Sequence, residues 1–458
     1  MRILRIMSGL SAIALGGGGL AIALLGPGAE VTASPAIRAA GTAREISLAC
    51  PPDFEETMGE TVGLDGEESD PRLRTRAIVV GGGDAALDDR ALPAGESRTF
   101  FEAGAFPGEL TVEPLDTPVL AAASTQRFQD SGELAGLALT PCIPPVNVQY
   151  LVGGSTSASS SAQLVLTNVT GSPATVTVTV HTSTGTADTS VLSTVAVDAH
   201  SSHSMILEAG VRDDRIAVEI ASTGGQIASH LFVHEIDGIS GAGIESVTPG
   251  AEPATTTIVP GADLSGENGS VELRVANPGS ERATVSISAI TAEGIEDVPG
   301  AQDVVLAPGT VLDLSMDGLA GAWSALRVEA DVPVLAGARI TSEGDYGWLA
   351  SSSASTRSAV SVPESVSHLT LYSDEPTTAL VTSLDREGNV LESETVTVSP
   401  IAAITSPDDT SFITIESETP IHAGILALKD LDTMIGIAGL STTVPPAASN
   451  DLVLRVID

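Results

Sequence analysis

Residues 328–338 read VEADVPVLAGA, and this phrase recurs along the chain. An alternating apolar run leads into a short polar turn, and a second apolar run follows that opens with proline. Proline is tolerated at the first residue of a strand. The phrase therefore predicts two consecutive β-strands. Other copies are VEPLDTPVLAAA (112–123), IESETPIHAGI (415–425) and the more divergent IASTGGQIASH (220–230).

A second phrase precedes the first one in three copies. It reads LVLTNVTGSPATVTVTVHTSTG at 164–185, LRVANPGSERATVSISAITAEG at 273–294 and LTLYSDEPTTALVTSLDREG at 369–388. Its alternating residues bury one face of a strand and leave the other face in water. About seven short strands per copy, at a period of roughly 90–108 residues, predict an all-β protein built from tandem immunoglobulin- or fibronectin-like β-sandwich units.

The repeats divide the chain into a leader, four β-sandwich units and a tail. Linkers such as SVTPGAEPATTT (246–257) join the units, so the sequence favours a rod or an arc over one globule. The predicted ranges are 1–33 (signal peptide or membrane anchor), 34–49 (linker), 50–145, 146–250, 251–358 and 359–445 (the units), and 446–458 (tail or added strand).

A double glycine, Gly153–Gly154, aligns with Pro260–Gly261 of the next copy. We expect a turn at the end of the first strand of the unit, because glycine adopts positive φ at little cost. No helix and no lysine follow, so a phosphate-binding loop is a poor interpretation.

The N-terminus has the pattern of an exported protein. Arg2 and Arg5 precede an uncharged run from Ile6 to Leu25, and Val31–Ala33 supplies small residues for cleavage. We expect this run to form a hydrophobic helix, and it is also long enough to cross a bilayer. Arginines before the run and acids after it predict that the remainder lies outside the cytoplasm. Cleavage and retention as an anchor both remain open.

Cys50 and Cys142 are the two cysteines, in the similar contexts ACPPDF and PCIPPV. An even number of cysteines in an exported protein predicts a disulfide. A zinc site would need further ligands, and no histidine lies near either cysteine in the sequence. We therefore expect a structural bridge that ties the end of the first unit to its beginning.

The charge balance limits the partners. The formal net charge is −39, and Lys429 is the single lysine. Binding to phosphate depends on clustered Lys and Arg, so nucleic acid and anionic lipid surfaces are unfavourable partners. The predicted contact with a membrane is confined to the N-terminal segment, and no cofactor is expected.

Catalytic and metal patterns are weak. His230 and His234 in HLFVHE lack the H-E-x-x-H order, and on a strand residues four apart are about 13 Å from each other. No G-x-S-x-G elbow occurs. The acid pairs Asp88–Asp89, Asp213–Asp214 and Asp408–Asp409 fall in turn-like segments, where calcium remains an alternative to simple solvation. We predict no enzymatic activity, no catalytic residues and no metal ligands.

Two aromatic residues carry the remaining hypothesis of a site. Tyr346 and Trp348 in GDYGWLASS (344–352) could be exposed as a platform on which a sugar stacks. The alternative is that they close the end of a β-sandwich. Asn168 and Asn268 match the glycosylation sequon, which is also common by chance.

Cys142, the run Tyr150–Gly154 and LVLTN at 164–168, with the repeated PV-x-A phrase, resemble the large secreted actinobacterial proteins of unknown function. The resemblance implies export and a β architecture and supplies no catalytic residues. The sequence thus predicts an exported, non-enzymatic cell-envelope or extracellular protein with a structural, adhesive or scaffolding role. The alternative is an accessory carbohydrate-binding or envelope-glycan assembly module. The partner would be a cell-surface glycan or an envelope protein.

Overall fold

A computed structural model describes most of the chain after residue 36. The described residues are 37–39, 45–57, 69–93, 97–105, 107–113, 119–188, 194–266, 269–319, 323–342, 344–362, 366–444 and 452–454. They contain thirty-four strands, one 3₁₀ turn over Leu207–Ala209 and no α-helix, which confirms the all-β class. The helix predicted within 1–33 lies outside these residues. Within the described part, no helix is long and apolar enough to span a bilayer.

The chain forms two compact units. In the smaller unit, β1 (Ile37–Ala39) pairs antiparallel with β34 (Leu452–Leu454). The larger unit, Ala43–Pro446, holds everything described below. Its strands fall into four consecutive groups, and each group makes a pair of antiparallel sheets that share one core; we call each group a two-sheet unit.

The first two-sheet unit has the sheets β2-β7-β4-β5 and β6-β3-β8-β9. The bounds are β2 (Ile46–Cys50), β3 (Arg72–Val80), β4 (Ala85–Leu87), β5 (Arg90–Ala91), β6 (Ser97–Ala103), β7 (Gly108–Val112), β8 (Leu120–Gln129) and β9 (Gly136–Pro141). The second unit has β10-β16-β12-β13, with β14 also on β12, and β15-β11-β17-β18. Its strands are β10 (Val148–Val152), β11 (Ser160–Asn168), β12 (Ala174–Thr182), β13 (Gly185–Thr186), β14 (Thr194–Val197), β15 (Ser201–Ile206), β16 (Ile216–Gly224), β17 (Ala228–Asp237) and β18 (Ser240–Val247).

The third and fourth units repeat this order, except that one long strand serves both sheets. The third has β19 (Ala254–Asp263), β20 (Ser270–Ala276), β21 (Ala283–Thr291), β22 (Gly294–Asp297), β23 (Val304–Leu306), β24 (Val311–Ser315), the long β25 (Trp323–Thr341) and β26 (Tyr346–Ala350). The fourth has β27 (Ser355–Ser361), β28 (Val366–Tyr372), β29 (Thr377–Leu384), β30 (Val390–Val398), β31 (Ile401–Thr405), the long β32 (Phe412–Asp430) and β33 (Ile435–Ser441).

The long strands correct one detail of the prediction. The phrase at 328–338 was expected to be a strand, a turn and a strand, but β25 runs through it without a break and pairs with β21 in one sheet and β20 in the other. Strands that switch sheets by bending form the corners of packed sheets. Pro333 lies between the two paired stretches, where a missing backbone donor is tolerated.

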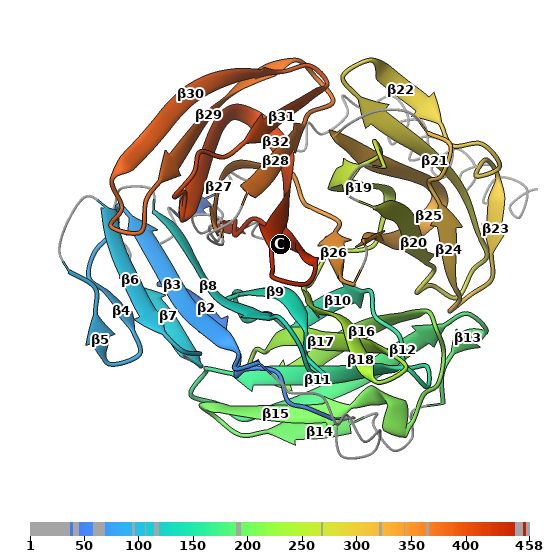
Figure 1. The fold of residues 1–458 in the computed structure, drawn as a ribbon, viewed down its shortest axis with the longest axis horizontal. Coiled ribbons are helices and arrows are strands. Elements are labelled where there is room, and N and C mark those ends of the chain that lie inside the picture. Colours follow the sequence, from blue (N-terminus) through green and yellow to red (C-terminus); the bar gives the residue numbers. More distant parts are fainter. Residues whose placement is uncertain are drawn as a thin grey trace, which may run out of the picture. The chain divides into compact units, whose positions relative to one another are not determined.

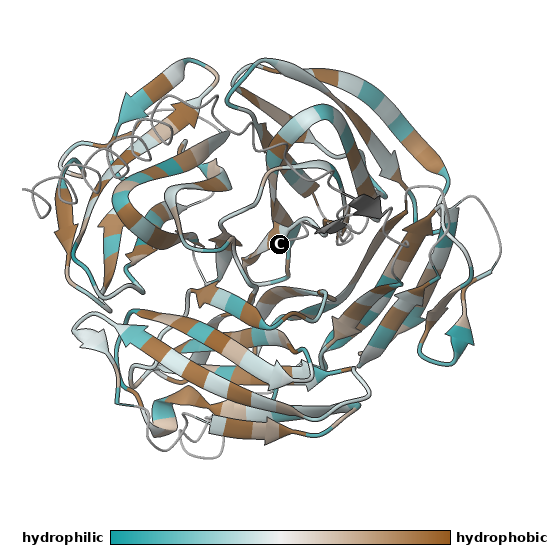
Figure 2. Cartoon of the chain, turned by 180° about the vertical axis from the view of Figure 1, so that it is seen from behind, coloured by the Kyte–Doolittle hydropathy of each residue, from teal (hydrophilic) through white to brown (hydrophobic). Residues whose placement is uncertain are grey.

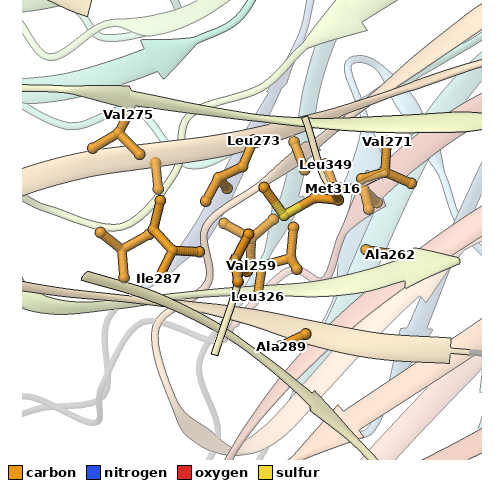
Figure 3. Packing of buried hydrophobic residues seen from close by; sticks show 14 of the residues in the cluster. Val259, Ala262, Val271, Leu273, Val275, Ile287, Ala289, Met316, Leu326 and Leu349 are labelled. Carbon is orange, nitrogen blue, oxygen red and sulfur yellow. The ribbon is translucent and has the colours of Figure 1, made fainter. Parts of the chain in front are cut away.

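Alternation along the strands builds the cores. On β12, Val176, Val178 and Val180 are buried while the threonines between them face outward. Figure 2 shows the same banding of hydrophobic and hydrophilic residues on many strands. Figure 3 shows the core of the third unit, where short branched side chains such as Val275, Leu273 and Ile287 from both sheets meet. Aromatic residues are only 3% of the chain, and the cores rely little on them.

The four two-sheet units close into a ring, which is best followed in Figure 1. The leading strand of each unit (β2, β10, β19 or β27) packs against the next unit, and β27 of the fourth packs on β3 and β8 of the first. The last strand of each unit (β9, β18, β26 or β33), called the inner strand, contacts the inner strands on both sides. Units joined by the same head-to-tail contact form a closed ring when the rotations between them add up to a full turn. The predicted rod or arc is therefore wrong.

Two further predictions concern the disulfide and the glycine turn. Cys50 and Cys142 form the expected disulfide, with a sequence separation of 92. Gly154 follows the end of β10 with φ +81°, as expected of a turn, whereas Gly261 has φ +103° at a register shift inside β19. The predicted domain ranges describe parts that would fold independently, and this stays a prediction.

Candidate functional site

One buried carboxylate joins all four inner strands at the centre of the ring. Asp345 immediately precedes β26, and its Oδ2 accepts hydrogen bonds from the backbone N–H groups of Leu137 on β9 (2.9 Å) and Ile437 on β33 (3.0 Å). Its Oδ1 accepts the N–H of Ile244 on β18 at 3.2 Å. Inner strands lie at sheet edges, so these N–H groups have no ladder partner. Asp345 supplies the acceptor that each buried donor requires.

A second carboxylate, Glu245 on β18, does the same beside it. Its Oε2 accepts the N–H groups of Trp348 on β26 (3.1 Å) and Gly439 on β33 (2.9 Å), and its Oε1 accepts the N–H of Ser246 (2.7 Å). We call Asp345 and Glu245 the hub carboxylates. Both are almost fully buried.

The hub carboxylates are subject to two opposing effects. Burial disfavours the charged form, whereas the N–H donors favour it. Burial dominates for both groups: it raises the pKa of Asp345 to about 8 and holds the pKa of Glu245 well above its usual range. Perturbed carboxyl groups often mark catalytic sites, but all the contacts of this pair described above join inner strands, except the one from Glu245 to the adjacent Ser246.

Glycines make the close approach possible. A Cβ on Gly243 would lie 2.6 Å from Asp345 Oδ1, and one on Gly136 would lie 2.7 Å from the same atom. A Cβ on Gly439 would lie 2.0 Å from the carbonyl oxygen of Trp348. The inner strands can therefore meet only because these positions carry no side chain.

The aromatic pair predicted as a sugar platform lies in the joint between units. Tyr346 is 1% exposed and Trp348 is 5% exposed. The guanidinium of Arg339 stands 4.3 Å from the Tyr346 ring centroid, and that of Arg274 stands 4.7 Å from the Trp348 ring. The exposed platform is therefore wrong. Glycines of adjacent strands leave space for the two rings: a Cβ on Gly153 would lie 2.9 Å from the Trp348 ring, and one on Gly243 would lie 2.7 Å from the Tyr346 ring.

Arg274 connects the third unit to the second. Its Nε and Nη2 bond both carboxylate oxygens of Asp313 at 2.8 Å, and the remaining donors reach the carbonyl oxygens of Gly154, Ile216 and Asp214. Arg76 plays a similar part where the first unit meets the fourth. Its Nη1 donates to the carbonyl oxygen of Val362 in the fourth unit at 2.8 Å. Such forked donors suit several fixed carbonyl and carboxylate acceptors at once.

A cavity of about 350 Å³ opens where the four inner strands end. The segments that follow β9, β18, β26 and β33 contribute to its wall, and we call it the axial pocket. Thr248 and Ser441 both line it and are in hydrogen-bond contact, with their hydroxyl oxygens 3.4 Å apart. The wall is held by backbone bonds from Gly250 N–H to Tyr150 O (2.9 Å) and from Ala251 N–H to Ser351 O (3.0 Å).

His230 and His234 both lie on β17, but their ring nitrogens contact different groups. His230 donates from Nε2 to the carbonyl of Pro141 at 2.8 Å, and burial lowers its pKa to about 4, so the ring is neutral. His234 Nε2 lies 2.9 Å from Glu133 Oε1. Among the described residues, no group of three or more His, Cys, Asp or Glu side chains could hold a metal ion.

Two other residues from the sequence analysis, Asp88 and Asn168, meet at a smaller cavity. Asp88, Asn168 and His200 line about 300 Å³ of space beside the disulfide. Asp88 accepts the N–H of Glu109 at 2.7 Å. Asn168 donates to the carbonyls of Ser172 and Val197, so this sequon asparagine shapes a turn; Asn268 lies outside the described residues.

The other acid pairs lie in turns. Asp213 accepts the N–H of Arg215 at 2.9 Å, and Asp409 adopts a positive φ of +65°. Sequence reasoning missed the hub carboxylates altogether. The available signal was an acid amid the glycines of an apolar strand, as in GAGIESV (241–247) and EGDYGWL (343–349).

Comparisons with known proteins add a family and little else. No curated protein matches the chain. A solved structure of Streptomyces avermitilis alpha-L-rhamnosidase complexed with L-rhamnose aligns at 9% identity with a TM-score of 0.14, and the match covers 88% of this chain and 57% of that chain. The chain thus spans little more than half of that enzyme's length, and a similarity this weak supports no argument. A family model described as "Family of unknown function (DUF5719)" matches residues 100–406, well over half of the chain, so the protein belongs to this family.

Proposed function

We propose that this protein is an exported, non-enzymatic scaffold of the cell envelope. The observation that carries the proposal is the closed ring, in which the ionisable groups most suited to chemistry are used as joints. The hub carboxylates accept backbone N–H groups, and Arg274 and Arg76 hold neighbouring units together. A rigid body of this kind suits a structural, adhesive or scaffolding role.

Export is the second part of the proposal. The disulfide supports it, because disulfides persist in oxidising compartments. The Arg-flanked apolar run at residues 6–25 supports it from the sequence. The units resemble immunoglobulin- or fibronectin-like sandwiches in that each is a pair of antiparallel sheets, although their first and second strands lie in different sheets.

The test uses the full chain with a C-terminal epitope tag, expressed in a bacterium. Protease added to intact cells should remove the tag, and a cytosolic reporter should survive. Mass spectrometry of the N-terminus distinguishes cleavage from anchoring. Under non-reducing conditions no free thiol should react with maleimide. A protected tag or two reactive cysteines would contradict the proposal, as would hydrolysis of generic ester, peptide or glycoside substrates by the purified chain.

The alternative, a glycan-binding module, now depends on a different site. The platform of Tyr346 and Trp348 is buried, whereas the axial pocket is open and carries many hydroxyl groups.

A further inference from the structure

The axial pocket contains an unused hydrogen-bonding group. Gln149 lines it and is 6% exposed, and its Oε1 is buried with no hydrogen-bond partner among the described residues. A buried acceptor without a partner costs about 1–3 kcal/mol. Because the side chain lies in the wall of the cavity, a rotation of its terminal amide would bring Oε1 to a bound molecule that supplies the missing donor.

The rest of the polar wall consists of hydroxyl groups. Seven serine and threonine residues line the pocket. Some hold the wall together, as Ser352 does by contacting His422 Nδ1 at 3.0 Å. Ser353, Thr442 and Thr443 make no side-chain hydrogen bond to the described part of the chain. A hydroxyl both donates and accepts, so such a wall pairs well with a ligand whose own groups do both.

Charge narrows the class of ligand. Among the described residues that line the pocket there is no lysine or arginine, and the chain has a net charge of −39, so a phosphate or carboxylate ligand would be repelled. Glu252, which is exposed, is the one carboxylate that the described part of the chain contributes to the wall. A single solvated carboxylate offers little to a cation. The wall therefore favours an uncharged ligand.

The pocket also has apolar faces of limited size. Tyr150 lies on one side, where burial raises its pKa and keeps the phenol neutral, and Pro144 and Pro249 lie nearby. Flat apolar faces between hydroxyl groups match a pyranose ring, which presents C–H faces and an equatorial belt of hydroxyls. The volume of about 350 Å³ lies at the small end of ligand pockets, which are roughly 300–1,000 Å³. It suits one or two sugar rings.

We propose that the axial pocket binds an uncharged sugar residue at the end or on a branch of a glycan, with the Gln149 amide accepting from a sugar hydroxyl. This goes beyond the scaffold role, because the ring is held by the hub carboxylates and the interunit arginines whether or not the pocket is filled.

Isothermal titration and saturation-transfer NMR of the full chain test the proposal. The probes are D-glucose, D-galactose, D-mannose, L-arabinose and their disaccharides, with D-glucuronate, D-glucosamine and a proline-rich decapeptide as competitors. At least one uncharged sugar should bind, with an affinity unchanged from about 50 to about 500 mM NaCl. Gln149→Leu should weaken binding about tenfold and Thr442→Val about threefold.

Controls separate recognition from folding. Thr395→Val makes the same change as Thr442→Val at an exposed position of β30 that is not among the lining residues, so it should leave binding intact. Thermal melting checks that each variant folds, and Thr442→Val keeps the test valid if Gln149→Leu does not. The proposal is overturned if no uncharged sugar binds, if only the charged sugars or the peptide bind, or if both pocket variants bind as the wild type does. None of these results bears on export or on ring stability.

Discussion

The inner strands and the outer hairpin strands are both edges of sheets, yet their free backbone groups are satisfied in opposite ways. The outer strands β5, β13, β22 and β30 end their sheets at the solvent. On β30, Val390 is 61% exposed and Glu392 is also exposed, and water can satisfy the free backbone groups. The inner strands β9, β18, β26 and β33 are largely buried and face each other, where we find carboxylates in place of water.

The difference shows what it takes to bury a sheet edge. Exposed edges are protected from aggregation by charge, twist or short length. A buried edge must instead have an acceptor for each N–H and no Cβ in the way. Asp345 and Glu245 provide the acceptors, and Gly136, Gly243 and Gly439 provide the space.

Removing one acceptor from the centre tests whether the inner strands depend on the hub carboxylates. Asp345→Ala leaves the N–H groups of Leu137, Ile244 and Ile437 buried and unpaired. At about 1–3 kcal/mol each, the expected loss in free energy of unfolding is about 5 kcal/mol by urea denaturation. The matched outer variant Glu392→Ala should change it by less than about 0.5 kcal/mol. Similar losses for the two variants would contradict the role of the hub.

Arg274→Ala tests the joint that flanks the hub. It breaks a bidentate ion pair with Asp313 and uncovers the carbonyls of Gly154 and Ile216, so we expect a loss of about 4 kcal/mol. Arg274→Lys should recover only part of this, because an ammonium group lacks the fork. Arg386→Ala, whose ion pair with Glu387 is exposed, should cost at most about 1 kcal/mol. Full rescue by lysine would rule out the forked geometry as the cause.

Gly439→Ala tests the requirement for space. The added methyl would meet the Trp348 carbonyl at 2.0 Å, and we expect a loss of about 3 kcal/mol, seen as a lower melting temperature. At Gly171 the nearest atom to an added Cβ is 3.9 Å away, so Gly171→Ala should be close to neutral. Equal melting temperatures for the two variants would show that the inner strands have room to spare.

The smallest expected effect is a dependence of stability on pH. Burial raises the pKa of Asp345 to about 8, so the folded state keeps a proton that the unfolded state has lost. That contribution is complete below the unfolded pKa and disappears as the pH rises through about 8. Between pH 7 and 9 the free energy of unfolding should fall by about 1 kcal/mol, and less in Asp345→Asn. A rise over the same interval would reverse the sign of the argument.

Local patterns predicted local features well. Period-2 alternation predicts β12 and β21, the paired cysteine contexts predict the Cys50–Cys142 bridge, and Gly154 turns as expected. These features depend on neighbours in sequence or on a choice among very few partners. The all-β class follows from the same patterns.

The ring and its centre could not be predicted in this way. Asp345 bonds Leu137 across 208 residues, and no periodicity reports such a contact. The same limit explains the mistaken platform. Nothing in the stretch GDYGWLASS shows that Arg339 and Arg274 lie over the two rings, or that glycines of other strands let the chain approach them closely.

Closure has a consequence for how this family can change over evolutionary time. An open array of modules tolerates gain or loss of a member, because each one touches only its neighbours and the ends are free. Here the last module touches the first, so deleting or duplicating a quarter of the circle would leave a gap or a clash at the centre. We therefore expect copy number to be locked among relatives, and variation in length to accumulate in the hairpins at the rim.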